Sequence, residues 1–213
     1  MADPTLGSSG APEPSTAGSD YAERLVRLGG ARWKRVLDVQ RPYRWNLRRL
    51  ELGRTLDVGC GIGRNLVALD DAVGVDHNAE SVAVARERGL RAWTATEWPT
   101  CPDANLGSFD SMLLAHVLEH LDEDDADGVL RSYLPYLRPA ARLVFICPQE
   151  RGYATDATHV RFADLATLEA TARSLGFVPT RSYSFPFPRV AGKVFPYNEF
   201  VVIAERRDLA AGA

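Results

Sequence analysis

The sequence has 213 residues, of which 46% are apolar, and its 25 Lys and Arg against 28 Asp and Glu give a net charge of −3. This size and balance indicate one soluble globular domain and argue against a protein that coats nucleic acid through a uniformly positive surface. No apolar run approaches the roughly 18 residues needed to span a bilayer, and the chain does not open with a basic-then-apolar leader, so we expect a cytoplasmic protein. Three cysteines without paired metal spacing, Cys60, Cys101 and Cys147, predict free thiols.

The N-terminal part divides into two segments. Residues 1–19 consist mainly of Pro, Gly, Ser, Ala and Thr, and we expect a disordered tail. Residues 20–51 carry apolar residues at helical spacing, which predicts two or three helices, broken near residues 29–30 and near Pro42. Arginines are frequent from residue 32 to residue 54 and are expected to form a solvated helix face. RNA binding is the alternative, with Trp33, Tyr43 and Trp45 stacking on bases, although aromatic residues at helical spacing more often pack.

From residue 54 on, short β-branched runs alternate with helical stretches, which is typical of a mainly parallel sheet covered on both faces. The sequence predicts a doubly wound, seven-stranded α/β domain over 52–207, followed by a short tail over 208–213. The predicted strands cover 54–58, 72–75, 90–94, 109–114, 142–147, 178–184 and 199–205, and the predicted helices cover 63–69, 78–88, 124–137 and 164–175. The segment 183–198 is rich in Pro and aromatic residues and is long for a simple connection, so we expect it to shape a pocket.

A glycine-rich turn follows the first predicted strand. Residues 59–63 read GxGxG, a pattern that lets backbone approach a ligand closely before a helix begins. Asp57 precedes the turn, and Asp76 ends the next strand, where a carboxylate can bind a ribose diol. A dinucleotide site needs GxGxxG, but residue 64 is arginine. Because a carboxylate at position 57 would repel a diphosphate, the pattern favours a cofactor that carries an ammonium group.

This motif, together with segments 109–121 and 137–143, resembles the class I S-adenosylmethionine-dependent methyltransferases, nearest to those that O-methylate small molecules and glycans. The resemblance covers most of residues 40–205 and implies their Rossmann-like fold, with the N-terminal helices capping the site. It implies S-adenosylmethionine as cofactor, with Asp57 and the turn at the methionyl part, Asp76 at the ribose and Arg44 at the methionyl carboxylate. The full set of implied cofactor contacts is Arg44, Asp57, Gly59, Cys60, Gly61, Gly63, Asp76, His77, Thr94, Ala95 and Ala115.

The expected adenine contact departs from this pattern. Many relatives carry an acidic residue after the third strand to receive the adenine amino group, and Thr94 stands in its place here. Adenine could be held by Thr94 and the Ala95 backbone with Glu97 or Trp98 nearby, or by none of these.

Methyl transfer to a hydroxyl requires alignment of donor and acceptor and removal of a proton, so a base is expected near the methyl donor. His116, His120 and His159 are the candidates, because His77 follows the ribose-binding acid. The prediction gives His159, His120 and Glu119 the catalytic roles and requires no metal.

The run from His116 to His120 also resembles the ExxEH segment that ligates a divalent ion in ubiquinone-pathway and small-RNA 3′-terminal O-methyltransferases. His116 replaces the first Glu of that segment, which weakens the case for magnesium. Two interpretations stay open. Either Glu119, His120 and His159 hold a divalent ion, or Glu119 and His120 orient the next helix without one.

Polar, aromatic and titratable residues crowd into 152–162, at the edge where ligands bind in such sheets. This segment is similar to a D-x-T-H-V-R segment of bacterial methyltransferases that act on glycans or lipid-linked sugars. Asp156 or Arg161 could bind the acceptor, or Asp156 and Thr158 could cap the following helix. The acidic residues of 122–127 are expected to complement a helix dipole and not to bind a metal.

The sequence thus predicts an S-adenosylmethionine-dependent methyltransferase (EC 2.1.1) that O-methylates a small molecule or a glycan or lipid-linked sugar. The alternatives are methylation of RNA through the basic N-terminal helices and a cofactor-binding protein without turnover.

Overall fold

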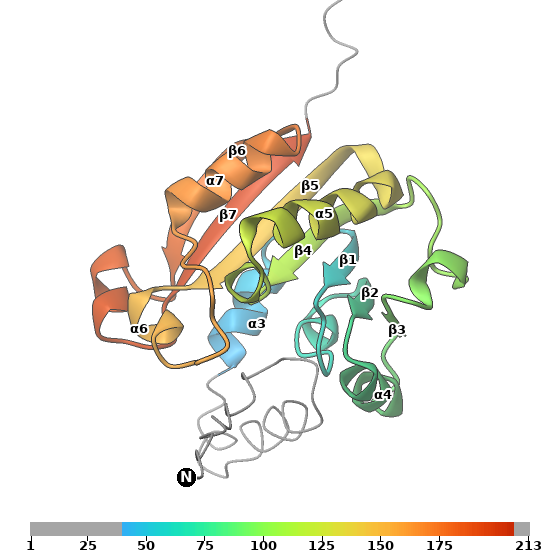
Figure 1. The fold of residues 1–213 in the computed structure, drawn as a ribbon, viewed down its shortest axis with the longest axis horizontal. Coiled ribbons are helices and arrows are strands. Elements are labelled where there is room, and N and C mark those ends of the chain that lie inside the picture. The colour runs from blue at the N-terminus through green and yellow to red at the C-terminus, as the bar shows by residue number, and fades with distance from the viewer. Residues whose placement is uncertain (1–39, 207–213) are drawn as a thin grey trace, which may run out of the picture.

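The structure, a computed structural model, describes residues 40–206. They form one seven-stranded sheet with the order β3-β2-β1-β4-β5-β7-β6, in which β7 runs antiparallel to both neighbours and the other pairs are parallel (Figure 1). The strands are β1 (Arg54–Val58), β2 (Asp71–Asp76), β3 (Ala92–Thr94), β4 (Phe109–Ala115), β5 (Leu137–Pro148), β6 (Phe177–Phe185) and β7 (Glu199–Arg206). The α-helices are α3 (Arg41–Arg48), α4 (Ala79–Glu87), α5 (Glu123–Tyr133), α6 (Glu150–Tyr153) and α7 (Leu165–Ser174). The predicted doubly wound α/β fold is confirmed.

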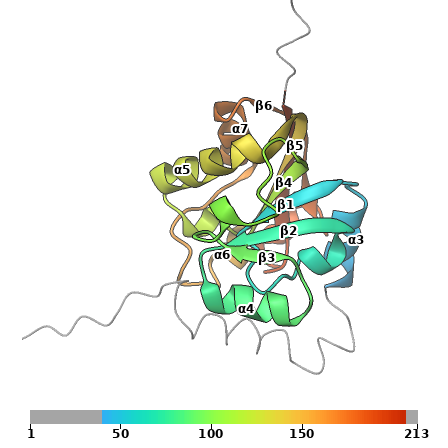
Figure 2. The ribbon, with the colours of Figure 1, turned by 90° about the vertical axis from the view of Figure 1, so that its right-hand side faces the viewer.

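Alternating residues of the central strands face two separate cores. On β4, Met112 and Leu114 pack with residues of α5 and α7, whereas Leu113 packs with Leu47 and Leu50 at the end of α3. Figure 2 shows α5 and α7 on one side of the sheet and α3 on the other. Because the period of a strand is two residues, this alternation fixes which face of β4 each helix covers.

Among the differences between the predicted elements and the structure, three have a clear physical reason. The predicted helix 63–69 is a turn that ends in one 3₁₀ turn (Leu66–Ala68), because the glycine turn occupies most of the short connection from β1 to β2. β5 begins at Leu137, five residues before its predicted start, because Leu137 pairs with Phe109 across a register shift in β4. Pro42 does not break the helix at that point. It lies in the first turn of α3, where its missing N–H costs nothing.

Several predictions concern residues outside the described range. They are the tail 1–19, the helices before residue 40 with Trp33, and the C-terminal tail. Of the predicted helical segment 20–51, the structure describes residues 40–51, which contain α3. None of the helices between residues 40 and 206 has the length and apolar character that crossing a membrane requires.

Candidate active site

The glycine turn connects β1 to β2 at the carboxyl edge of the sheet. Gly59, Gly61 and Gly63 all have positive φ, at 77°, 51° and 79°, which a residue with a side chain adopts only at a cost. A Cβ atom on Gly59 would lie 2.3 Å from Val117 Cγ2, so the turn also packs closely against the loop after β4. The sequence therefore supplies glycine where the backbone needs it, and the turn presents its main chain at the edge where ligands bind.

Asp57 lies beneath this turn. Its side chain is completely buried, and neither carboxylate oxygen has a hydrogen-bond partner of normal geometry among the described residues. Burial raises the pKa of Asp57 from 3.8 to about 7, the Asn65 side chain opposes the rise, and the negative charge of Asp76 adds to it. A buried carboxylate without a partner fits a cationic ligand above it.

Asp76 ends β2 and is tied to the turn. Its Oδ2 accepts from the Gly61 N–H at 2.7 Å, and its Oδ1 accepts from the Asn78 N–H at 2.8 Å. His77 is half exposed, and its Nδ1 lies 3.4 Å from Asp76 Oδ1. A carboxylate fixed by two backbone donors retains lone pairs for a diol, which is the role expected for Asp76.

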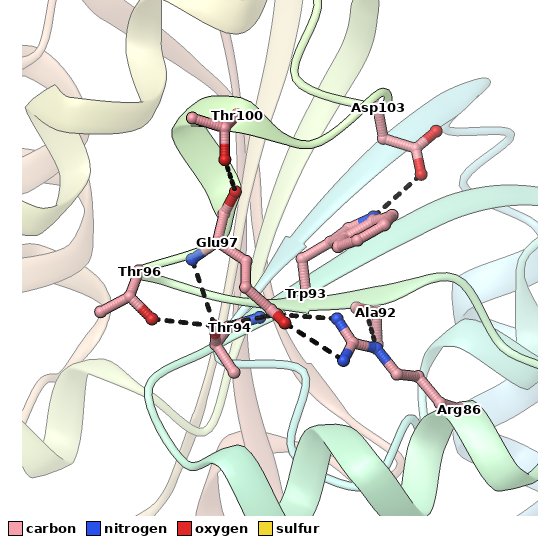
Figure 3. A network of polar contacts seen from close by, with 8 residues as sticks. All are labelled: Arg86, Ala92, Trp93, Thr94, Thr96, Glu97, Thr100 and Asp103. Carbon is pink, nitrogen blue, oxygen red and sulfur yellow. Dashed lines mark hydrogen bonds and ion pairs between the residues drawn. The ribbon is translucent and has the colours of Figure 1, made fainter.

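A network of polar contacts surrounds Thr94 and Glu97, where the sequence predicts the adenine contact (Figure 3). Glu97 accepts from the Thr94 N–H and hydroxyl, both at 2.9 Å, and from Arg86 Nη2 at 2.7 Å. These bonds hold the pKa of Glu97 at about 2. The Ala95 N–H already donates to the Asp76 carbonyl. The Thr94 hydroxyl and the Ala95 N–H are thus engaged in bonds within the protein, and Glu97 is an ionised, half-exposed acceptor beside them.

Trp98 belongs to the core and not to this site. Its ring is 2% exposed and packs against Phe109, Tyr133 and Tyr136. Of the other implied cofactor contacts, Cys60 is buried within the glycine turn, Ala115 ends β4, and Arg44 lies half-buried on α3. The sequence predicted a packed position for the aromatic residues of α3. Tyr43 contacts Phe185 edge-on, but Trp45 stacks on Phe185 while remaining 55% exposed.

His116 follows β4 with a φ of 60°, an uncommon conformation for a residue other than glycine. Its Nδ1 lies 3.1 Å from Glu119 Oε1, and its Nε2 lies 2.8 Å from Glu199 Oε1. Partial burial opposes the charged form of the ring, but the two carboxylates outweigh it and raise the pKa of His116 to about 10. His116 is therefore committed to an ion-pair bridge between two elements and is removed from the candidate bases.

Glu119, His120 and His159 come together, as the sequence predicted. One ligand atom from each lies within 4.8 Å of the others. His120 Nδ1 faces the Thr158 carbonyl at 3.2 Å, and His159 Nδ1 faces the Tyr153 carbonyl at 2.7 Å. Since a carbonyl only accepts, each Nδ1 donates to its carbonyl, and in a neutral ring Nε2 then carries the lone pair. Burial and the neighbouring His159 lower the pKa of His120 against the opposing charge of Glu119.

Glu119 is fully buried in this cluster. Burial alone would raise the pKa of Glu119, but the hydrogen bond and charge of His116 hold it below its usual range. Its Oε2 has no nitrogen or oxygen partner among the described residues, and the Cys147 thiol, whose pKa is raised by burial and by Glu119, is the weak donor beside it. Within the run 116–120, Leu118–His120 form a 3₁₀ turn and not an α-helix.

The structure tests two capping interpretations, one for the segment 152–162 and one for the acidic run 122–127. Asp156 Oδ1 accepts from the Thr158 N–H and hydroxyl and so fixes the turn that presents His159. The predicted capping of the next helix by Asp156 is wrong, because Asp164 caps α7 by accepting from Thr167 N. The acidic residues of 122–127 cap and begin α5, with Asp122 accepting from Asp125 N, as predicted.

Sequence reasoning missed the residues that fix the long segment after β6. Gln149 and Asn198 are fully buried and bonded to each other at 3.1 Å, and Gln149 Nε2 also donates to Ser184 Oγ and to the Glu199 carbonyl. This network anchors the segment 186–198 to the ends of β5 and β7. The signal in the sequence that could have indicated Gln149 and Asn198 is their polar character beside otherwise apolar strand ends.

Comparison with known proteins agrees with this geometry. A family sequence model described as a methyltransferase domain matches residues 56–143, which include the glycine turn, Asp76 and the run 116–120. Residues 56–143 thus match a methyltransferase domain, in agreement with the resemblance of their motifs to the class I S-adenosylmethionine-dependent methyltransferases. No curated protein matches this methyltransferase in sequence.

Solved structures share the fold of the methyltransferase at low identity. One is an S-adenosylmethionine-dependent methyltransferase from Archaeoglobus fulgidus (19% identity, TM-score 0.61, 77% of this chain and 93% of that one). Another is magnesium protoporphyrin IX methyltransferase from Synechocystis with S-adenosylhomocysteine bound (16% identity, TM-score 0.62, 90% of this chain and 97% of that one). A third is 1,6-didemethyltoxoflavin N1-methyltransferase from Burkholderia thailandensis with its acceptor and S-adenosylhomocysteine (21% identity, TM-score 0.55, 93% of each chain). The last two act on different acceptors, so these likenesses show the shared fold and not the methylated group.

Proposed function

We propose that this chain transfers the methyl group of S-adenosylmethionine to an oxygen of a small molecule or of a glycan or lipid-linked sugar. The observation that carries the proposal is the convergence of Glu119, His120 and His159 at the carboxyl edge of the sheet, where the loop after β4 packs against the glycine turn through Val117 and Gly59. O-methylation requires that a hydroxyl lose its proton, and this cluster is the group of bases or ligands placed to achieve that. Asp156 and Arg161 are the nearby candidates for binding the acceptor.

The residues at the glycine turn fit S-adenosylmethionine. The orphaned carboxylate of Asp57 supports binding of the ammonium group, and the backbone-fixed carboxylate of Asp76 supports binding of the ribose. His77 flanks Asp76, and the main chain of residues 59–63 lies against the methionyl part. Glu97 is proposed to accept from the adenine amino group, because the hydroxyl of Thr94 is already turned toward Glu97.

The cluster also fits a divalent ion. One nitrogen from each of the two rings and one carboxylate oxygen lie within 4.8 Å of one another, which is close enough for the three to bind one ion. The hydrogen bonds from each Nδ1 to a carbonyl are the outer contacts that orient histidine ligands of metals. When bound, such an ion would polarise the acceptor hydroxyl and lower its pKa. His120, His159 and Glu119 would hold the ion, and in its absence His159 Nε2 would accept the acceptor proton.

The test is incubation of the protein with methyl-labelled S-adenosylmethionine and fractionated cell extract, divided into small-molecule, glycan, lipid and RNA fractions. We expect label in a small-molecule, glycan or lipid fraction, in a form that NMR identifies as a methyl ether or ester. The variant His159→Asn should lower the rate by at least 100-fold, as loss of a general base or ligand does. Exclusive labelling of RNA, destroyed by nuclease, or of nitrogen would contradict the proposal.

A further inference from the structure

We propose that a surface formed by α3 and the segment 186–198 binds membranes that contain anionic phospholipid, so that the enzyme takes a lipid-linked acceptor from the bilayer. This inference deepens the proposed function and rests on it for the transfer of a methyl group to oxygen. We call the surface the apolar patch, and its exposed members are Trp45, Phe187, Val190, Val194 and Tyr197.

The apolar patch holds most of the exposed apolar side chains of the described residues. Nine large apolar side chains are exposed between residues 40 and 206, and five of them belong to the patch. Val190 and Val194 are 70% and 77% exposed. Two more, Val160 and Phe162, lie in the loop that carries His159. Such a concentration of exposed apolar side chains marks a surface that binds a partner or a membrane.

Ring contacts and one hydrogen bond join α3 to the segment 186–198. Trp45 stacks on Phe185, which directly precedes the segment, with ring centroids 6.5 Å apart. The Tyr43 hydroxyl donates to the Tyr197 carbonyl. Within the segment, edge-on ring contacts at 5.3 and 5.6 Å link Phe187, Phe195 and Tyr197. The patch is therefore one continuous surface.

The fold holds the valines of the patch on its outer side. They flank Gly192, which is buried in the 3₁₀ turn Arg189–Lys193, and a Cβ atom on Gly192 would lie 1.8 Å from Gln149 Oε1. Asn198 fixes the start of the segment, because its Oδ1 accepts from the Phe187 N–H at 2.9 Å and its amide donates to the Phe187 carbonyl at 3.2 Å. Since Gly192 occupies the inner side of the turn, Val190 and Val194 remain exposed.

The charge around the patch complements an anionic surface. Residues 40–49 and 186–198 contain no acid, although the whole chain has a net charge of −3. Their six basic residues are Arg41, Arg44, Arg48, Arg49, Arg189 and Lys193. Arg189 pairs with Glu150, which leaves a positive excess over the two segments. Basic residues beside exposed aromatic and aliphatic side chains are typical of surfaces that lie in the headgroup region of anionic bilayers.

The aliphatic members of the patch favour lipid over single-stranded RNA. Surfaces that bind single-stranded nucleic acid combine basic residues with flat rings on which bases stack. Val190 and Val194 offer no such ring, yet they are the most exposed members of the patch. Branched aliphatic side chains instead bury their surface at the boundary between headgroups and acyl chains.

The patch lies next to the loop that carries the candidate base His159. A Cβ atom on Gly152 of α6 would lie 2.4 Å from the Pro196 carbonyl oxygen, so α6 packs directly against the segment. Figure 1 shows the turn of the segment beside α6, at the same end of the sheet as α3. The His159 ring stacks on Tyr153, the last residue of α6. A bilayer against the patch would therefore present its headgroups at the edge of the sheet where the cluster lies.

The experiment measures sedimentation of the full chain with lipid vesicles. Vesicles of phosphatidylcholine with about one third phosphatidylglycerol are compared with vesicles of phosphatidylcholine alone. We expect about tenfold higher affinity for the anionic vesicles, and a loss of about tenfold when the salt concentration rises from about 0.05 M to about 0.5 M.

Two variants test the apolar and the basic part of the patch. Val194→Ser should lower the affinity for anionic vesicles about tenfold, because less apolar surface is buried in the bilayer. Lys193→Gln should lower it about fivefold and reduce its dependence on salt. Leu106→Ser is the matched control, because Leu106 is 73% exposed but precedes the amino end of β4, at the opposite edge of the sheet, and it should bind like the wild type. Melting curves verify that each variant folds.

Methyl transfer connects the patch to the acceptor. The lipid fraction of the cell extract is incorporated into the anionic vesicles and incubated with the protein and methyl-labelled S-adenosylmethionine. We expect label on oxygen in the lipid extract, and labelling about tenfold slower with Val194→Ser than with Leu106→Ser at a vesicle concentration that leaves most of the wild type unbound. Both variants should bind S-adenosylhomocysteine like the wild type in calorimetry.

The outcomes separate this inference from the proposed function. A full chain that does not sediment with anionic vesicles, or a Val194→Ser variant that binds them like the wild type, overturns the inference and leaves O-methylation of a water-soluble acceptor standing. Binding of single-stranded RNA in place of vesicles, or a dimer that Val194→Ser dissociates, assigns the patch to another occupant and overturns the inference as well. Vesicle binding that depends on Val194, together with label confined to nitrogen, supports the membrane surface and overturns the proposed function.

Discussion

Replacing Asp57 by asparagine should stabilise the protein without cofactor and, at the same time, weaken cofactor binding. The carboxylate is completely buried, and burial is the largest cause of its pKa rise from 3.8 to about 7. Each unit of pKa difference between the folded and unfolded states corresponds to about 1.4 kcal/mol, so the ionised form costs roughly 4 kcal/mol at pH 8. Because the pKa of Asp57 is higher in the folded protein than in the unfolded chain, the protonated carboxyl stabilises the fold relative to the ionised one. This stabilisation is complete below pH 4 and is lost as the pH rises through 7.

The assay is thermal unfolding at pH 8 and at pH 4, with and without S-adenosylhomocysteine. At pH 8 the Asp57→Asn variant should melt roughly 5–10 °C above the wild type, if about 2–4 kcal/mol is recovered in a chain of this size. At pH 4 the difference should largely vanish, because Asp57 is then protonated in the folded protein and about half protonated in the unfolded chain. The stabilisation by S-adenosylhomocysteine at pH 8 should be lost in the variant.

Asp70→Asn is the matched control, because Asp70 is exposed and should change neither result. A variant at position 57 that melts below the wild type at pH 8 would refute the argument about burial. An unchanged response to S-adenosylhomocysteine would instead refute the role of Asp57 at the ammonium group.

The remaining predictions concern the turn, the adenine end and the anchored segment. Gly59→Ala should lower the free energy of unfolding by about 1–3 kcal/mol and abolish S-adenosylhomocysteine binding. The control Gly89→Ala has a similar φ but no atom within 4 Å of the new Cβ, so it should lower the free energy of unfolding by only about 1 kcal/mol and bind the ligand normally. Denaturant unfolding measures the stability of both variants, and calorimetry measures their binding. In calorimetry, Glu97→Gln should bind S-adenosylhomocysteine about tenfold more weakly than the wild type does but bind its 6-oxo analogue S-inosylhomocysteine without such a loss. An equal loss of affinity for both ligands would argue against the adenine contact. Asn198→Ala should lower the unfolding free energy by about 1–3 kcal/mol in urea because the partners of a buried amide are left unsatisfied, and an unchanged midpoint would show that the segment 186–198 does not depend on this anchor.

The sequence predicted the features that are local along the chain. The glycine turn, Asp57 and Asp76 follow from strand ends and the positive φ values that only glycine adopts readily, and the seven strands follow from apolar runs. The prediction of a helix at 63–69 was wrong, because the spacing of apolar residues does not show how many residues the glycine turn occupies. The bridge from His116 to Glu199 joins residues 83 positions apart, so no local pattern could show that Glu199 would reach this site.

Glu119, His120 and His159 were predicted from two separate segments because each follows a parallel strand, and such strand ends meet at one edge of the sheet. Their protonation was not predictable in the same way. Two carbonyls fix the histidine rings, that of Tyr153 at the end of α6 and that of Thr158 in the loop after it, and no motif in the sequence predicts either contact.

Calorimetry with S-adenosylhomocysteine and with NAD tests the central claim, that the glycine turn with Asp57 and Asp76 binds S-adenosylmethionine, most directly. The account predicts binding of one equivalent of S-adenosylhomocysteine by the wild type, a loss of at least tenfold in affinity in Asp76→Ala, and no binding of NAD. Binding of NAD without S-adenosylhomocysteine, or an Asp76→Ala variant that binds S-adenosylhomocysteine like the wild type, would contradict it.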